Sequence, residues 1–128
     1  MKRLGLCPEK RVAYFEYDFA VDGGAIGTIA LRGDKLPNDA VITSGMIQSN
    51  TALTSGGAAT VTMGVETAVD VLASTAYTAF TANALKDTVP VGTAATSIRT
   101  TTGGKGVNMA IGAAALTGGK ITVALEYL

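Results

Sequence analysis

The sequence predicts an all-β protein: an antiparallel β-sandwich, jelly-roll-like, with a short extended N-terminal arm at residues 1–10 and one domain at residues 11–128. A chain of 128 residues has the usual length of a single domain. About eight short segments have strand composition and are separated by glycine-rich turns, which is typical of sandwiches and jelly rolls. Ala, Thr and Gly make up 55 of the 128 residues, so large core-forming side chains are scarce.

The first strand is predicted at residues 11–19, where side chains alternate between two faces. Phe15 and its odd-numbered neighbours form one face, and Tyr14 and its even-numbered neighbours form the other. This period of two is expected of a half-buried strand. We expect the Phe15 face to join the core, and we interpret Tyr14 as a candidate anchor at a protein–protein contact.

Further strand segments follow, with turn residues between them. The expected strands are 25–31, 40–48 with a bulge at Gly45, 58–65, 67–80, 89–91, 96–101, 107–111 and 120–127. The alanine-rich spacing of 67–80 could also form one helical turn, but its β-branched and aromatic residues favour an extended chain. The expected turns are 23–24, 32–35, 37–39, 55–57, 101–106 and 117–119. Residues 52–57 and 115–119 share an Ala-Leu-Thr sequence before glycines. We interpret the two as separate hairpins with similar turns, and a duplicated unit is the alternative.

Composition excludes several classes of function. Ten Lys and Arg residues balance ten Asp and Glu residues, so no positive field exists to hold a nucleic acid. The chain has no His, the commonest general base and transition-metal ligand. Cys7 is the single cysteine and can build neither an internal disulfide nor, without His, a zinc site. We therefore expect no enzyme activity, no metal and no cofactor.

No export or membrane segment is expected. The N-terminus lacks the ~7–15 apolar residues of a signal peptide, and Leu6 stands before Cys7 where a lipoprotein site requires a small residue. Polar residues interrupt the charge-free stretch 40–65, which therefore falls short of the ~20 apolar residues of a spanning helix. The sequence predicts a soluble protein with no membrane partner.

Three short motifs resemble ligand sites but lack essential parts. Residues 22–27 follow a strand as a dinucleotide-binding loop does, but Asp22 stands in place of the first glycine. Lys105 and Lys120 follow glycines, but neither is followed by the Ser or Thr of a phosphate-binding loop. Arg32-Gly33-Asp34 is the tripeptide of adhesion ligands, although all three residues are common in turns.

Charge is distributed unevenly along the chain. The first 39 residues contain 12 of the 20 charged side chains, and residues 40–85 contain only Glu66 and Asp70. Burial in this charge-poor segment could raise the pKa of either acid, as in a hydrolase, but we interpret both as solvent-facing strand-end charges. Because a solvated surface is normally about a quarter charged, the segment is either buried on both sides or faces a partner.

Several segments resemble small virion proteins from the structural cassettes of tailed phages. They are 11–19, 23–27, 36–42, 51–65 and 89–93, and the resemblance extends over residues 11–127. By size and β character the chain is most similar to the capsid cement, or decoration, proteins. The resemblance implies a jelly-roll-like oligomer that lies over joints between major capsid subunits.

The resemblance also implies a function. The protein would bind the outside of a phage capsid as a dimer or trimer and cement neighbouring major capsid subunits, after synthesis in the host bacterial cytoplasm. A tail- or fibre-associated module that binds a receptor or glycan is the alternative. The candidate contact residues are those of the basic arm and of the first strand and turn: Lys2, Arg3, Lys10, Arg11, Tyr14, Arg32 and Asp34.

Overall fold

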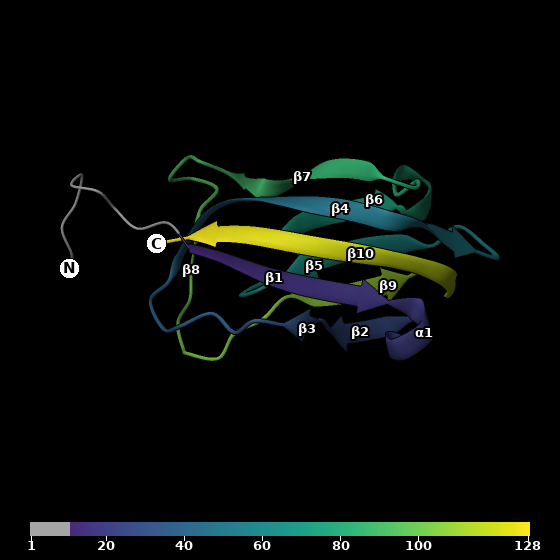
Figure 1. Ribbon diagram of the computed structural model, residues 1–128, viewed down its shortest axis with the longest axis horizontal. Coiled ribbons are helices and arrows are strands. Elements are labelled where there is room, and N and C mark those ends of the chain that lie inside the picture. The colour runs from purple at the N-terminus through teal and green to yellow at the C-terminus, as the bar shows by residue number, and fades with distance from the viewer. Residues whose placement is uncertain (1–10) are drawn as a thin grey trace.

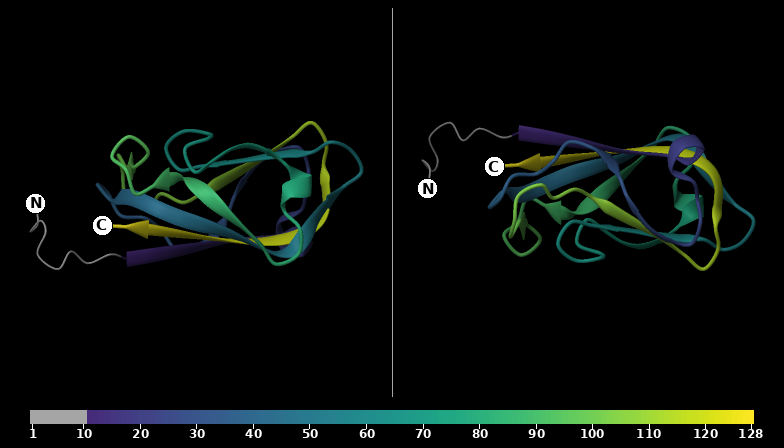
Figure 2. Two further views of the ribbon diagram at one scale, coloured as in Figure 1. Left: turned by 90° about the horizontal axis from the view of Figure 1, so that it is seen from above. Right: turned by 90° about the horizontal axis from the view of Figure 1, so that it is seen from below.

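Two antiparallel sheets packed face to face form the protein (Figures 1 and 2). The computed structural model describes residues 11–128, so the predicted arm at 1–10 lies outside the described residues. The larger sheet has the order β3 (Arg32–Gly33), β1 (Arg11–Asp18), β10 (Leu116–Tyr127), β4 (Val41–Ser55), β7 (Ala84–Val91), and β8 (Ile98–Arg99) also pairs with β4. The smaller sheet has the order β2 (Gly27–Ala30), β9 (Asn108–Gly112), β5 (Thr60–Gly64), β6 (Leu72–Ala76). The predicted antiparallel sandwich is confirmed, and the jelly-roll assignment stays a prediction.

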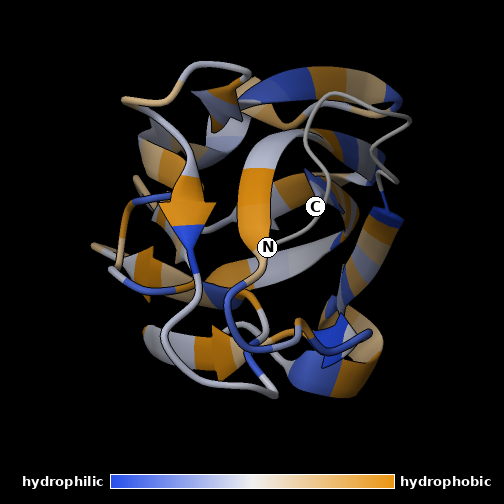
Figure 3. Ribbon diagram, turned by 90° about the vertical axis from the view of Figure 1, so that its left-hand side faces the viewer, coloured by the Kyte–Doolittle hydropathy of each residue, from blue (hydrophilic) through white to orange (hydrophobic). Residues whose placement is uncertain are grey.

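The core lies between the two sheets and follows from the alternation of side chains along each strand. In β1, Ala13, Phe15 and Tyr17 are buried while the residues between them are exposed or half-buried, as predicted for the Phe15 face. Alternate residues of β10 and of the smaller sheet meet them, so apolar and polar residues alternate along the strands in Figure 3. The main contributors from those strands are Ile121, Val123, Leu125, Val61, Met63, Met109 and Ile111.

Residues 117–119 form no turn, contrary to the prediction. They lie inside β10, which starts at Leu116 and pairs with the end of β4. The register shifts at this point, and Gly119 has a φ of +130°. These glycines therefore mark irregular pairing within a long strand. The similar segments 52–57 and 115–119 pair with each other, with Thr54 and Thr117 hydroxyls 2.8 Å apart, instead of forming two separate hairpins.

The predicted strand at 67–80 is shorter in the structure. The Asp70 carboxylate accepts hydrogen bonds from the backbone N–H groups of Val65, Glu66 and Thr67 at 2.7 to 2.9 Å. A side chain that satisfies these donors favours a turn over a ladder. Regular pairing therefore starts at β6 and ends at the short 3₁₀ helix η1 (Tyr77–Ala79).

Other boundaries also differ from the predictions. A four-residue helix, α1 (Phe19–Asp22), follows β1, because the Asp18 side chain caps its first turn and Gly23, at φ +77°, ends it. β7 begins at Ala84, five residues before the predicted strand. At Gly45 the predicted irregularity is present, since the pairing of β4 with β7 shifts there.

Candidate functional site

Three of the predicted contact residues meet at one edge of the larger sheet. Tyr14 lies on β1 and Arg32 on β3, and Asp34 follows β3. They line a shallow depression of about 510 Å³, together with Phe15, Glu16, Gly33 and Thr122. Arg11 begins β1 and is exposed, whereas Lys2, Arg3 and Lys10 lie outside the described residues.

Backbone pairing with the segment after β3 fixes the position of Tyr14. The Asp34 carboxylate accepts a hydrogen bond from the Tyr14 N–H at 2.9 Å, and the Asp34 N–H donates to the Tyr14 carbonyl at 3.0 Å. Gly33 of β3, which pairs with Phe15 of β1, has a φ of +143°, and a Cβ there would overlap the Tyr14 carbonyl oxygen. The edge backbone is thus capped, while the Tyr14 side chain projects outward and is 56% exposed.

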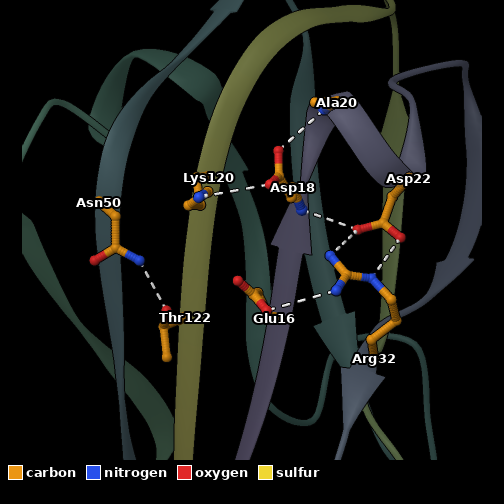
Figure 4. Close-up of polar contacts among 8 residues, drawn as sticks. All are labelled: Glu16, Asp18, Ala20, Asp22, Arg32, Asn50, Lys120 and Thr122. Atoms are coloured by element: carbon orange, nitrogen blue, oxygen red, sulfur yellow. Dashed lines mark hydrogen bonds and ion pairs between the residues drawn. The ribbon is translucent and has the colours of Figure 1, made fainter.

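The Arg32 guanidinium joins β3 to α1 and β1 (Figure 4). It donates two hydrogen bonds to Asp22, both at 3.1 Å, and lies 3.5 Å from the Glu16 carboxylate. The hydrogen bond from Arg32 holds the pKa of Asp22 below its ordinary value, helped by the backbone N–H of Asp18. Because Arg32 and Asp34 both have partners within the chain, the adhesion interpretation of the tripeptide is not supported.

Tyr17 supports the same contacts around Arg32 and Asp22 from the core side of the sheet. Its side chain is fully buried, and its hydroxyl donates a 2.5 Å hydrogen bond to the Gly23 carbonyl at the end of α1. Burial, and then the charges of Asp22 and Asp18, raise the pKa of this hydroxyl to about 12. The polar network under the depression is therefore anchored to the core.

The sequence interpretation missed a second feature, which is the outer face of the larger sheet. We use this name for the outward-facing side chains of β1, β10, β4 and β7. Six of the ten exposed large apolar side chains in the described part of the chain lie on it: Val12, Tyr14, Met46, Leu85, Val89 and Val91. Alternation along residues 40–48 could have indicated Met46, but Leu85 lies in a strand segment that the sequence did not predict.

The two acids considered for catalysis serve a structural role. Glu66 accepts hydrogen bonds from the Thr101 N–H and hydroxyl at 3.1 and 3.0 Å and lies 3.5 Å from the Lys105 ammonium. These contacts, the Thr101 N–H first, lower the pKa of Glu66, whereas a general acid needs a raised pKa. The idea that burial raises this pKa was wrong, because donors surround the carboxylate. Asp70 is occupied by three backbone N–H groups.

Within residues 11–128, no group of three or more Cys, His, Asp or Glu side chains is arranged to hold a metal ion. In the same range no helix is both long enough and apolar enough to cross a membrane.

The two packed sheets define a small antiparallel β-sandwich. The same fold occurs in chains of phage capsids. A chain of the cyanophage Pam1 capsid asymmetric unit matches with a TM-score of 0.68 and 19% identity, over 98% of this chain and 92% of its own length. A chain of the acid-stable capsid of Helicobacter pylori bacteriophage KHP30 matches at 0.64 and 16% identity, over 94% and 87%. A chain of the Ralstonia phage GP4 capsid matches at 0.62 and 17%, over 99% and 88%.

These likenesses show a shared fold at low sequence identity. No protein-family model and no curated protein matches the sequence.

Proposed function

We propose that this protein is a structural component of a phage virion, a cement protein that binds the outside of the capsid and holds neighbouring major capsid subunits together. The observation that carries the proposal is a match over nearly the whole chain to chains from three phage capsids. Those chains are only slightly longer than this one, since the match covers 87 to 92% of each. The likeness is therefore to a whole small capsid chain and not to part of a larger one.

The physical properties of the domain fit such a role. A sandwich rich in Ala, Gly and Thr buries less apolar area than average. Because each Å² of buried apolar area stabilises the folded state by about 25 cal/mol, the isolated domain gains little stability from its core. Binding to a partner stabilises the folded state by mass action. A capsid lattice that offers many copies of one site would therefore stabilise this domain and be stabilised by it.

The proposed contacts combine the basic arm with the edge of the larger sheet. Lys2, Arg3, Lys10 and Arg11 would reach acidic capsid surface, and Tyr14 would anchor the contact beside the Arg32 and Asp34 corner. An exposed aromatic side chain held on a paired backbone is a favourable anchor because it loses little freedom on binding. We propose that the protein acts as a dimer or trimer on the capsid.

Copy number per particle tests the proposal. Quantitative gels of purified virions should show hundreds of copies for a lattice protein, and capsids that lack the protein should lose resistance to heat or low salt. A handful of copies, or labelling of the tail in electron micrographs, would exclude a capsid cement role. Unchanged capsid stability without the protein would also count against it.

A further inference from the structure

We propose that the free edge of β2 is a contact between two copies of this protein, formed by antiparallel pairing of β2 with the β2 of a second copy. The contact would join the smaller sheets of the two copies into one continuous sheet. This inference rests on the dimer in the proposed function and names the strand that forms it.

β2 ends the smaller sheet, so one side of its backbone has no neighbouring strand (Figure 1). The Leu31 N–H donates to the Val107 carbonyl at 2.9 Å, which makes Leu31 a hydrogen-bonded position of the antiparallel pairing with β9. Because such positions alternate along a strand, Thr28 and Ala30 direct their N–H and C=O groups away from β9. Within residues 11–128, no loop or side chain occupies these groups.

The other three edge strands are each protected from such pairing. β3 has only two residues, and a register shift interrupts the pairing of β6 with β5. β7 contains Pro90, which has no N–H, and the Val89 N–H of the same strand donates to the Val71 carbonyl at 2.8 Å. β2 has no charged residue, no proline and no register shift. Because folded proteins usually protect their bare edges, this unprotected one indicates a partner strand.

The free groups of β2 are spaced so that the strand is complementary to itself. Thr28 and Ala30 are two residues apart, so a two-fold axis at Ile29 sets each of them opposite the other in the second copy. That register pairs both donors and both acceptors of each copy. The two Ile29 residues would then face each other as a non-hydrogen-bonded pair, with Cα atoms about 4.5 Å apart. Ile29 is only partly buried and packs against the core, so the contact would cover its apolar side chain.

The side chains around this edge also favour a second copy. β2 carries only Gly, Thr, Ile and Ala, so two copies approach without opposing like charges, and a segment of a different protein finds no charged group to recognise. The nearest charge along the chain, Arg32, is held by Asp22 and Glu16. Ile26, directly before β2, is 61% exposed, and Val21 of the preceding α1 is 65% exposed. These apolar side chains would add buried area to a contact made by a short strand.

Disulfide crosslinking tests the register directly. Ile29→Cys is made in a chain whose single natural cysteine is removed by Cys7→Ser. Because Cα atoms about 4.5 Å apart lie within the range that a disulfide spans, mild oxidation should link most of the protein into dimers. Thr62→Cys, on the inner strand β5 of the same sheet, is the control and should remain a single chain on a denaturing gel. The crosslink is measured on the free protein and on assembled particles.

Proline at the edge tests the backbone pairing. Ala30→Pro removes an N–H that points away from β9, and the extended Ile29 before it suits a proline. It should raise the dissociation constant of the dimer by about tenfold or more, measured by analytical ultracentrifugation of the free protein. Ala76→Pro, at the other edge of the sheet where φ is already −65°, is the control and should change that constant by less than about threefold. Thermal unfolding confirms that both variants are folded.

The outcomes separate this inference from the proposed function. If the protein is monomeric both free and on particles, or if Ile29→Cys crosslinks in neither state, the inference is overturned, while hundreds of copies per capsid would leave the proposed capsid role standing. A dimer that Ala30→Pro leaves intact, or that Ala76→Pro dissociates, uses another surface and also overturns the inference. If wild-type protein does not bind capsids, the proposed function fails, but crosslinking through position 29 in the free protein would still support the β2 contact.

Discussion

Replacing Tyr17 by Phe removes the buried hydroxyl that links the core to the Gly23 carbonyl at the end of α1. The lost hydrogen bond to the Gly23 carbonyl should cost about 1–1.5 kcal/mol of unfolding free energy near pH 8. The folded-state pKa of Tyr17 is raised from 10.0 to about 12. The stabilisation is therefore fully present below pH 10 and is lost as the pH rises through about 12. At pH 11, one unit above the ordinary pKa of Tyr, the unfolding free energy of the wild type should have fallen by at most about 1.4 kcal/mol through this group.

Urea unfolding at pH 8 and pH 11 measures both parts of this prediction. Circular dichroism is the suitable signal because the chain has no Trp. Wild type should exceed Tyr17→Phe in stability by about 1–1.5 kcal/mol at pH 8 and by close to zero at pH 11. Other titrating groups are common to the two proteins and cancel in the difference. Tyr14→Phe, at an exposed position, is the control and should change stability by less than about 0.5 kcal/mol. A difference that stays constant from pH 8 to pH 11 would refute the reasoning.

Three further substitutions test other parts of the structure. The buried Thr43 hydroxyl has no hydrogen-bond partner in the described structure, so Thr43→Val should stabilise the protein by about 1 kcal/mol; a lower thermal midpoint would contradict this. Gly33→Ala should destabilise by about 1–3 kcal/mol, because its Cβ would overlap the Tyr14 carbonyl at a φ of +143°; hydrogen exchange at the Tyr14 amide should speed up, and unchanged exchange would count against the proposed cap. The pKa of Asp22 is lowered mainly by Arg32, so its contribution is present above pH 3.8 and is lost as the pH falls through the lower folded-state value. Asp22→Asn should therefore be less stable than wild type at pH 7, and the gap should narrow as the pH falls below 3.8 in urea titrations; a gap of constant size at all pH values would be the failing result.

Several elements of the fold could be predicted because local physics decides them. The alternation of residues 11–18 is a property of one strand, and the structure buries Ala13, Phe15 and Tyr17 as that alternation requires. The irregularity at Gly45 and the bend at Gly56 and Gly57, directly after β4, also follow from local residue types. Local signals failed where long-range pairing overrode them, as at Gly118 and Gly119, which lie in a long strand against β4 and not in a turn.

The candidate site divides in the same way. The position of Tyr14 on the outer side of β1 followed from alternation, and its 56% exposure agrees. The partners of Arg32 could not be predicted, because Asp22 approaches it only through the turn after α1 and the pairing of β3 with β1. Sequence separation also hid the outer face of the larger sheet, since Tyr14 and Met46 are 32 residues apart and are brought into one row by β10.

The sequence by itself determined the class of the fold, since alternation and glycine-rich turns depend on neighbouring residues alone. It also determined that small side chains dominate and that charge is concentrated in the first third of the chain. Only the tertiary structure decided which outward faces come together. The register of β1, β10, β4 and β7 brings exposed apolar side chains from the two ends and the middle of the chain onto one face. Pairing between distant strands depends on the whole core, and no local window of sequence contains that information.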